Sequence, residues 1–138
     1  MTLSRTARRP WGWLALALLL GLMPSVASAD TFSPSPGTAD GAPGSLRDAI
    51  TQANANGEDD TITLSAGTYS LTLDGVGDDL NLTGDLDLTE AGFLVIIEGA
   101  GRTQTFIDQD AADRVFQVFA GATVVFRDLT IMGGRAAV

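Results

Sequence analysis

The sequence predicts an all-β protein, a short β-solenoid of about three to four coils whose amino-terminal end is closed by one α-helix. Short apolar runs, several of them alternating with polar residues, follow one another from residue 61 to residue 134. Gly, Asp and Thr separate these runs, as the corners of stacked coils require. A weak repeat spaced by 22 residues places 96–100 over 118–122, which favours a solenoid. A β-sandwich is the competing fold, but the dipeptides typical of tight hairpins are scarce between the runs.

The predicted helix follows Gly44 and ends at Asn56-Gly57, a sequence typical of a helix C-terminus. Ser45 has the side chain of an N-cap, and Asp48, three residues later, completes an approximate capping box. Leu46, Ala49, Ile50 and Ala53 share one apolar stripe, whereas Arg47 lies off it and is expected to seal the cap. We therefore expect a structural cap that is formed by Ser45, Leu46, Arg47, Asp48 and Ile50.

The predicted strands are short and come in close succession. They cover residues 62–64, 69–73, 86–88, 94–97, 106–107, 115–118, 123–126 and 129–131. Stacking of equivalent strands would place Leu, Ile, Val and Phe in inward-facing rows.

Residues 1–29 have the organisation of an export signal. Three Arg residues before position 10 form a basic start, an apolar core covers 11–23, and Ala27-Ser28-Ala29 is a cleavage motif. The core is shorter than the ~20 residues that a membrane span needs. We expect cleavage before Asp30 and a secreted or cell-surface protein that contacts the membrane only through this signal; an uncleaved anchor is the alternative.

Residues 30–43 contain three Pro, two Gly and several small polar residues, and this composition predicts a flexible linker. The domain would then cover 44–138. We expect it to be truncated at its carboxyl end, because 133–138 has no capping signal and solenoids normally cap both ends. Unpaired coil edges and an open apolar interior predict end-to-end association.

Cleavage after Ala29 would leave 109 residues with seventeen acidic side chains against five Arg, a net charge of −12, and no Lys, His or Cys. Such a chain repels nucleic acid and anionic lipid headgroups. Without Cys it has no disulfide, so its stability must come from packing or bound ions.

Gly44-Ser45-Leu46-Arg47-Asp48-Ala49 resembles the CSLREA motif, which names a family of exported bacterial and archaeal proteins. The similarity continues through 53–56, 60–64, 66–69, 84–88, 113–116 and 129–134, which together extend over nearly all of the mature chain. The resemblance implies a right-handed parallel β-helix of the pectin-lyase type on an extracellular or cell-surface protein. The sequence departs from the family at Gly44, where Cys is usual, and at Asp48, where Glu is usual.

Acidic residues on Gly-rich corners suggest one metal site. Hard oxygen ligands at Asp78, Asp79 and Asp85 could hold Ca²⁺. No calcium-loop motif is present, and solvated turn carboxylates are the alternative reading. We expect no other cofactor.

Catalysis by this chain alone is not expected, and no catalytic residue is assigned. Carboxylates are abundant, but no pair stands out, and the Arg residues are scattered. The sequence favours a structural or adhesive module whose partners are cell-surface glycans or further β-helix coils. The alternative is the amino-terminal part of a polysaccharide lyase or glycosidase, which fold analogy alone supports.

Overall fold

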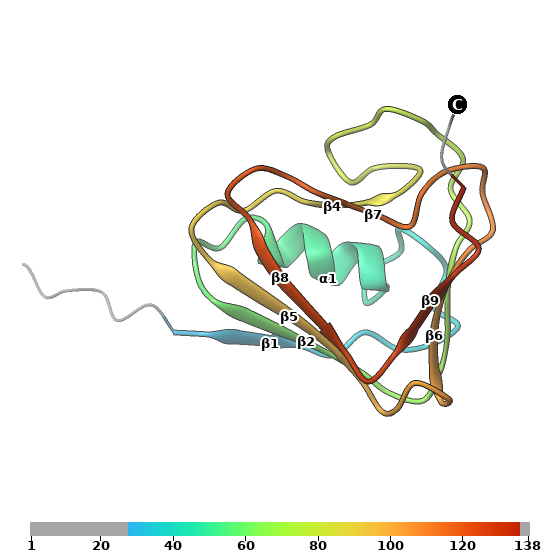
Figure 1. Ribbon diagram of the computed structural model, residues 1–138, viewed down its shortest axis with the longest axis horizontal. Coiled ribbons are helices and arrows are strands. Elements are labelled where there is room, and N and C mark those ends of the chain that lie inside the picture. Colours follow the sequence, from blue (N-terminus) through green and yellow to red (C-terminus); the bar gives the residue numbers. More distant parts are fainter. Residues whose placement is uncertain (1–27, 136–138) are drawn as a thin grey trace, which may run out of the picture.

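The computed structural model describes residues 28–135, so most of the expected signal, residues 1–27, lies outside the described part. The described chain folds into nine short strands and one helix (Figure 1). In chain order they are β1 (Asp30–Phe32), α1 (Leu46–Ala53), β2 (Asp60–Leu64), β3 (Gly67–Leu71), β4 (Leu86–Leu88), β5 (Leu94–Gly99), β6 (Thr105–Gln109), β7 (Phe116–Val118), β8 (Thr123–Arg127) and β9 (Thr130–Met132).

The strands form three sheets, in the orders β1-β2-β5-β8, β3-β6-β9 and β4-β7, and every pairing is parallel. Because each strand from β2 to β6 pairs with the third strand after it, the chain winds as a coil with three sides. Figure 1 shows these sides as a triangle, with α1 inside its outline. The chain is therefore a short parallel β-helix, as predicted, and parallel pairing throughout excludes the β-sandwich.

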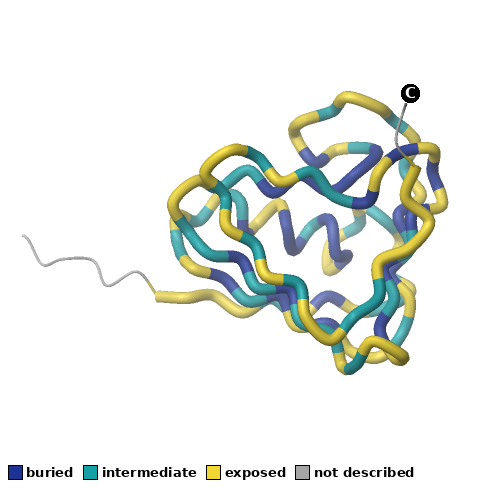
Figure 2. The backbone as a smooth tube through the Cα atoms, viewed as in Figure 1, coloured by how far each residue is buried: buried dark blue, intermediate teal, exposed yellow. Residues whose placement is uncertain are grey.

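Inward side chains of successive coils stack in rows that form the core. One row through the first sheet joins Ile62, Ile97 and Phe126, which are aligned in the strand register. Ile62 and Ile97 are fully buried, and burial of such a side chain contributes about 1.5–3 kcal/mol. Figure 2 shows the buried positions concentrated in the helix and the inner coils, whereas the last coil is mostly teal and yellow.

The 22-residue repeat that the sequence suggested is not the spacing between stacked strands. The register pairs Asp60 with Val95 and Val95 with Val124, which are offsets of 35 and 29 residues, and it pairs Phe106 with Thr130, an offset of 24. The 22-residue repeat matches none of these pairings. Corner loops of unequal length change the spacing from side to side, so a short similarity between two segments does not reveal which strands stack.

The helix closes the stack as predicted. Ser45 is the N-cap and its Oγ accepts from the backbone N–H of Asp48 at 3.1 Å. The Asp48 carboxylate accepts from the N–H of Gly44 rather than from that of Ser45, which already donates to the carbonyl of Ala42. The apolar stripe is buried in the same core cluster as Ile62 and Leu64; its members are Leu46, Ala49, Ile50 and Ala53.

The prediction of a flexible linker at 30–43 is wrong. Its first residues form β1, which extends the first sheet by pairing with β2. Further along, the carbonyl of Pro34 accepts from the hydroxyl of Tyr69, and the N–H of Gly37 donates to the carbonyl of Thr68. A composition rich in Pro and Gly resembles a linker, but here it forms the turns that lay this segment on the first coil.

Candidate functional site

Arg47, on the first turn of α1, is buried and binds two other parts of the chain. Its guanidinium forms an ion pair with Asp40, with Nε to Oδ1 at 2.8 Å and Nη2 to Oδ2 at 3.1 Å. It also donates to the carbonyls of Gly84 at 2.7 Å and Asp85 at 2.8 Å. Arg47 therefore joins the helix both to residues 30–43 and to the approach to β4. The sequence assigned this residue to the cap but gave no signal for Asp40 as its partner.

The loop from Gly75 to Thr83 covers the outer face of β4 (Figure 1). Asp85 and Asp87 alternate with the inward Leu86 and Leu88, which puts both carboxylates on that outer face. Both are fully buried all the same. We call this group the β4 carboxylates.

Asn81 fastens the loop over the β4 carboxylates. Its backbone is left-handed (φ 58°), a conformation that Asn tolerates better than most residues. Its N–H donates to Oδ2 of Asp87 at 3.0 Å, and its side-chain amide donates to the carbonyl of Arg47 and to Oγ1 of Thr51. One residue thus joins the loop, the strand and the helix.

Arg114, which precedes β7, pairs with Oδ2 of Asp85 from the neighbouring coil. Among the described residues, Oδ1 of Asp85 and Oδ1 of Asp87 have no hydrogen-bond partner. Burial raises the pKa of Asp87 to about 6, since the N–H of Asn81 offsets only part of the desolvation and nearby Asp85, Asp78 and Asp79 raise it further. Near neutral pH the buried Asp87 carboxylate is therefore a source of instability.

Replacing Asp87 with Asn should stabilise the protein at pH 7.5 and change little at pH 4. The folded-state pKa is raised, so the stability contributed by this group is present below its unfolded value near 3.8 and is lost as pH rises through about 6. That pKa shift corresponds to a gain of at most about 3 kcal/mol in the free energy of unfolding. Chemical denaturation at both pH values measures the difference, with the exposed Asp110→Asn as control, because Asp110 does not act on the pKa of Asp87. A variant that gains no stability over the parent at pH 7.5 contradicts this account.

The structure does not assemble the calcium site that the sequence suggested. Asp78 accepts from the N–H groups of Leu80, Leu82 and Thr83 within its own turn, and Asp79 is exposed. Burial raises the pKa of Asp78, but these three donors outweigh burial and the pKa is lowered. Asp85 lies under the loop and pairs with Arg114. Within residues 28–135, no three acidic side chains are grouped so that they could hold a metal ion.

The last coil exposes side chains that earlier coils bury. Its inward residues continue the core rows, and Phe116 and Phe126 pack together with ring centroids 4.7 Å apart. In the same coil Val118 is 48% exposed and Ile131 is 41% exposed. The strands β7, β8 and β9 are each the last of their sheet, so one edge of each is unpaired within the described chain. This end of the stack, which we call the last-coil face, is apolar and offers parallel strand edges.

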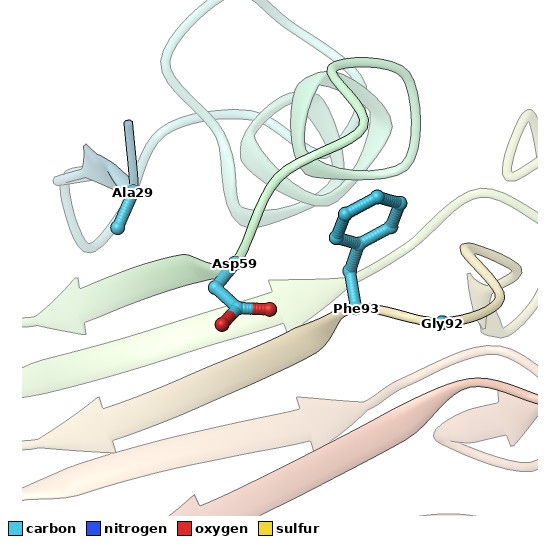
Figure 3. Close-up of a pocket in the computed structure, with 4 residues that line it drawn as sticks. All are labelled: Ala29, Asp59, Gly92 and Phe93. Atoms are coloured by element: carbon cyan, nitrogen blue, oxygen red, sulfur yellow. The ribbon is translucent and has the colours of Figure 1, made fainter. Parts of the chain in front are cut away.

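A small pocket lies in the first sheet beside the residues that precede β1, β2 and β5. It is open, has a volume of about 310 Å³ and is lined by Ala29, Asp59, Gly92 and Phe93. Figure 3 shows Asp59 between Ala29 and Phe93. The Asp59 carboxylate accepts from the N–H of Leu94 at 2.8 Å and so fixes the start of β5. Ala29, the last residue of the expected signal, is one of the residues that line this pocket.

Within the described residues, no helix has the length and hydropathy needed to cross a membrane. Comparison of the sequence with family models and curated proteins, and of the structure with solved structures, found no match.

Proposed function

We propose that this chain is an exported, non-catalytic β-helix module with a structural or adhesive role at the cell surface or outside the cell. The observation that carries the proposal is the contrast between the two ends of the stack. A helix fixed by a buried Arg closes one end, whereas the last-coil face offers apolar side chains and unpaired strand edges. Within the described residues the last-coil face is therefore the surface offered for contact, and further β-helix coils are the partner that best matches its strand edges.

Two further observations support this function. Within the described residues the first strand starts at Asp30, the residue that follows the cleavage motif, as expected when export removes residues 1–29. The β4 carboxylates, which would be the natural candidates for polysaccharide chemistry, are buried under a loop and pair with backbone groups and Arg114. A glycan chain cannot reach them while the loop is in place.

The role of the last-coil face is tested by light scattering of the mature chain over a concentration series. The parent is expected to associate as concentration rises, because no described residue covers the apolar last-coil face and its strand edges. Val118→Lys with Ile131→Lys, both on this face, should keep the chain monomeric. The matched control is Val125→Lys: Val125 is 41% exposed but alternates with the inward positions of β8, so association should persist. A parent that is monomeric at every concentration contradicts the proposed role.

Export is tested separately by expressing all 138 residues in a bacterial host and sequencing the amino terminus of the secreted and surface fractions. We expect a chain that starts at Asp30. Retention of residues 1–29 in the cell membrane would contradict an exported module. Incubation of the purified chain with acidic polysaccharides should release no unsaturated or reducing ends, and turnover would support the carbohydrate-active alternative.

A further inference from the structure

Asp60 is a carboxylate placed where the fold expects an apolar side chain. It is the first residue of β2 and lies on the inward side of that strand, in the same row as Val95 and Val124. Only 2% of it is exposed. Oδ1 accepts from the side-chain amide of Asn56 at 2.9 Å, but Oδ2 has no partner among the described residues. A buried carboxylate with a free oxygen is costly unless a positive group meets it.

The charged groups around Asp60 increase the cost of burying its carboxylate, because all of them are acidic. Glu58 and Asp59 precede it, the Asp30 side chain lies on the paired strand, and Glu90 approaches from the segment before β5, where it accepts from the N–H of Gly57 at 2.7 Å. Oε2 of Glu90 is a second buried oxygen without a partner in the described chain. Burial raises the pKa of Asp60, and it raises that of Glu90, with Asp60 and Glu58 adding to the rise. Among the described residues, the charges that act on Asp60 and Glu90 are all negative.

One nitrogen beside Asp60 can become a cation, the backbone nitrogen of Asp30. The register of β1 and β2 pairs Asp30 directly with Asp60. The N–H of Asp30 is close enough to the Asp60 carboxylate to favour its charged form, although it leaves Oδ2 without a full hydrogen bond. In the uncleaved chain this nitrogen is a neutral amide that is bonded to Ala29. Cleavage between Ala29 and Asp30 would turn the same atom into an ammonium group with three donors.

We propose that removal of the signal completes the fold by creating an ion pair between the new α-ammonium group of Asp30 and the buried carboxylate of Asp60. The reaction is hydrolysis of the Ala29–Asp30 peptide bond: water supplies one oxygen of the new Ala29 carboxylate, and its two protons pass to the nitrogen of Asp30, which becomes an ammonium group. This inference rests on the proposed export and its cleavage site. Its consequence is that the mature chain is more stable than its precursor, so the full stability of the stack appears only after processing.

The pH dependence of this ion pair follows from its two partners. An α-amino group has an ordinary pKa of about 8, and a carboxylate partner raises that value in the folded state. The stabilisation is therefore present below about 8 and is lost as pH rises through the raised pKa. It is also lost in acid, when Asp60 takes up a proton. The stabilisation by the ion pair should therefore be greatest between these two pH limits.

The test compares two purified chains that differ only at the amino terminus. One starts at Asp30 with a free amino group, and the other keeps Ser28 and Ala29 in front of it. At pH 7 the chain that starts at Asp30 should melt about 4–8 °C higher, the shift expected for one net favourable ion pair in a domain of this size. The difference should disappear above pH 10, and Nα-acetylation of Asp30 should abolish it.

Two variants assign the effect to Asp60. With Asp60→Asn the two chains should melt together, whereas Asp59→Asn, a change in the neighbouring carboxylate that binds Leu94, should leave the difference intact. If Asp60→Asn does not fold, the pH profile and the acetylation of the parent chains still show whether the ammonium group of Asp30 causes the difference in melting temperature. Equal melting temperatures of the two parent chains at pH 7 overturn the proposal. Because these chains are made with defined ends, the result does not depend on whether a cell exports the protein.

Discussion

Replacing Ile50 with Asp is expected to unfold α1 and the β-stack together. Ile50 is fully buried in the cluster that also contains Ile62 and Leu64. The change removes the apolar side chain and places a charge in the core; truncation alone costs about 2–5 kcal/mol and the buried charge adds to it. Small domains have only about 5–15 kcal/mol of stability, so cooperative unfolding should be lost or shifted far down in temperature.

Thermal unfolding followed by circular dichroism measures this effect. Ile50→Ala should show a graded loss without the charge, and Gln52→Ala, an exposed position on the same helix, should stay near the parent. If Ile50→Asp melted at the parent's temperature, α1 could not be the cap of the stack.

The second large effect is expected for Arg47→Met. The Asp40 carboxylate would remain buried, with 1% of its side chain exposed, after losing its cation. The carbonyl of Asp85 would lose the Arg47 donor, and that of Gly84 would keep only its longer hydrogen bond from Gln109. Breaking a buried pair on one side costs about 3–5 kcal/mol. We expect a loss of that size in urea denaturation, together with faster amide exchange in residues 30–43 because their main side-chain anchor is gone.

The control for this prediction is Arg127→Met. Arg127 pairs with Glu98 at 2.7 Å, but the two side chains are 50% and 35% exposed. Exposed pairs of this kind contribute about 0–1 kcal/mol. Similar losses in the two variants would show that the buried position of Arg47 has no special role.

The strands and the cap could be predicted because their signals are local. The alternation of Thr with apolar residues in 61–64 and the continuous apolar run 94–97 mark strands, and the stripe from Leu46 to Ala53 marks one helix face. Each of these patterns depends on residues within one element. They indicate which side chains face the core but not which strand will stack on which.

The features that the sequence did not reveal depend on contacts between distant segments. β1 has three residues and gains its order from pairing with β2, about thirty positions away, so its composition alone resembles a linker. The burial of Asp85 and Asp87 depends on a loop folding back over β4, and the alternation of 85–88 would place both in solvent. Likewise, nothing in the residues near Arg47 indicates that Asp40 will meet it.

The central claim is that helix and coils form one cooperative unit with α1 as its cap. Native-state hydrogen exchange of the mature chain tests it most directly, because exchange gives an opening free energy for each amide. We predict that the hydrogen-bonded amides of α1 and those of β2 and β5 exchange with the same free energy, equal to that of global unfolding. Amides of α1 that exchange as fast as in an unstructured peptide, while β5 remains protected, would contradict the claim.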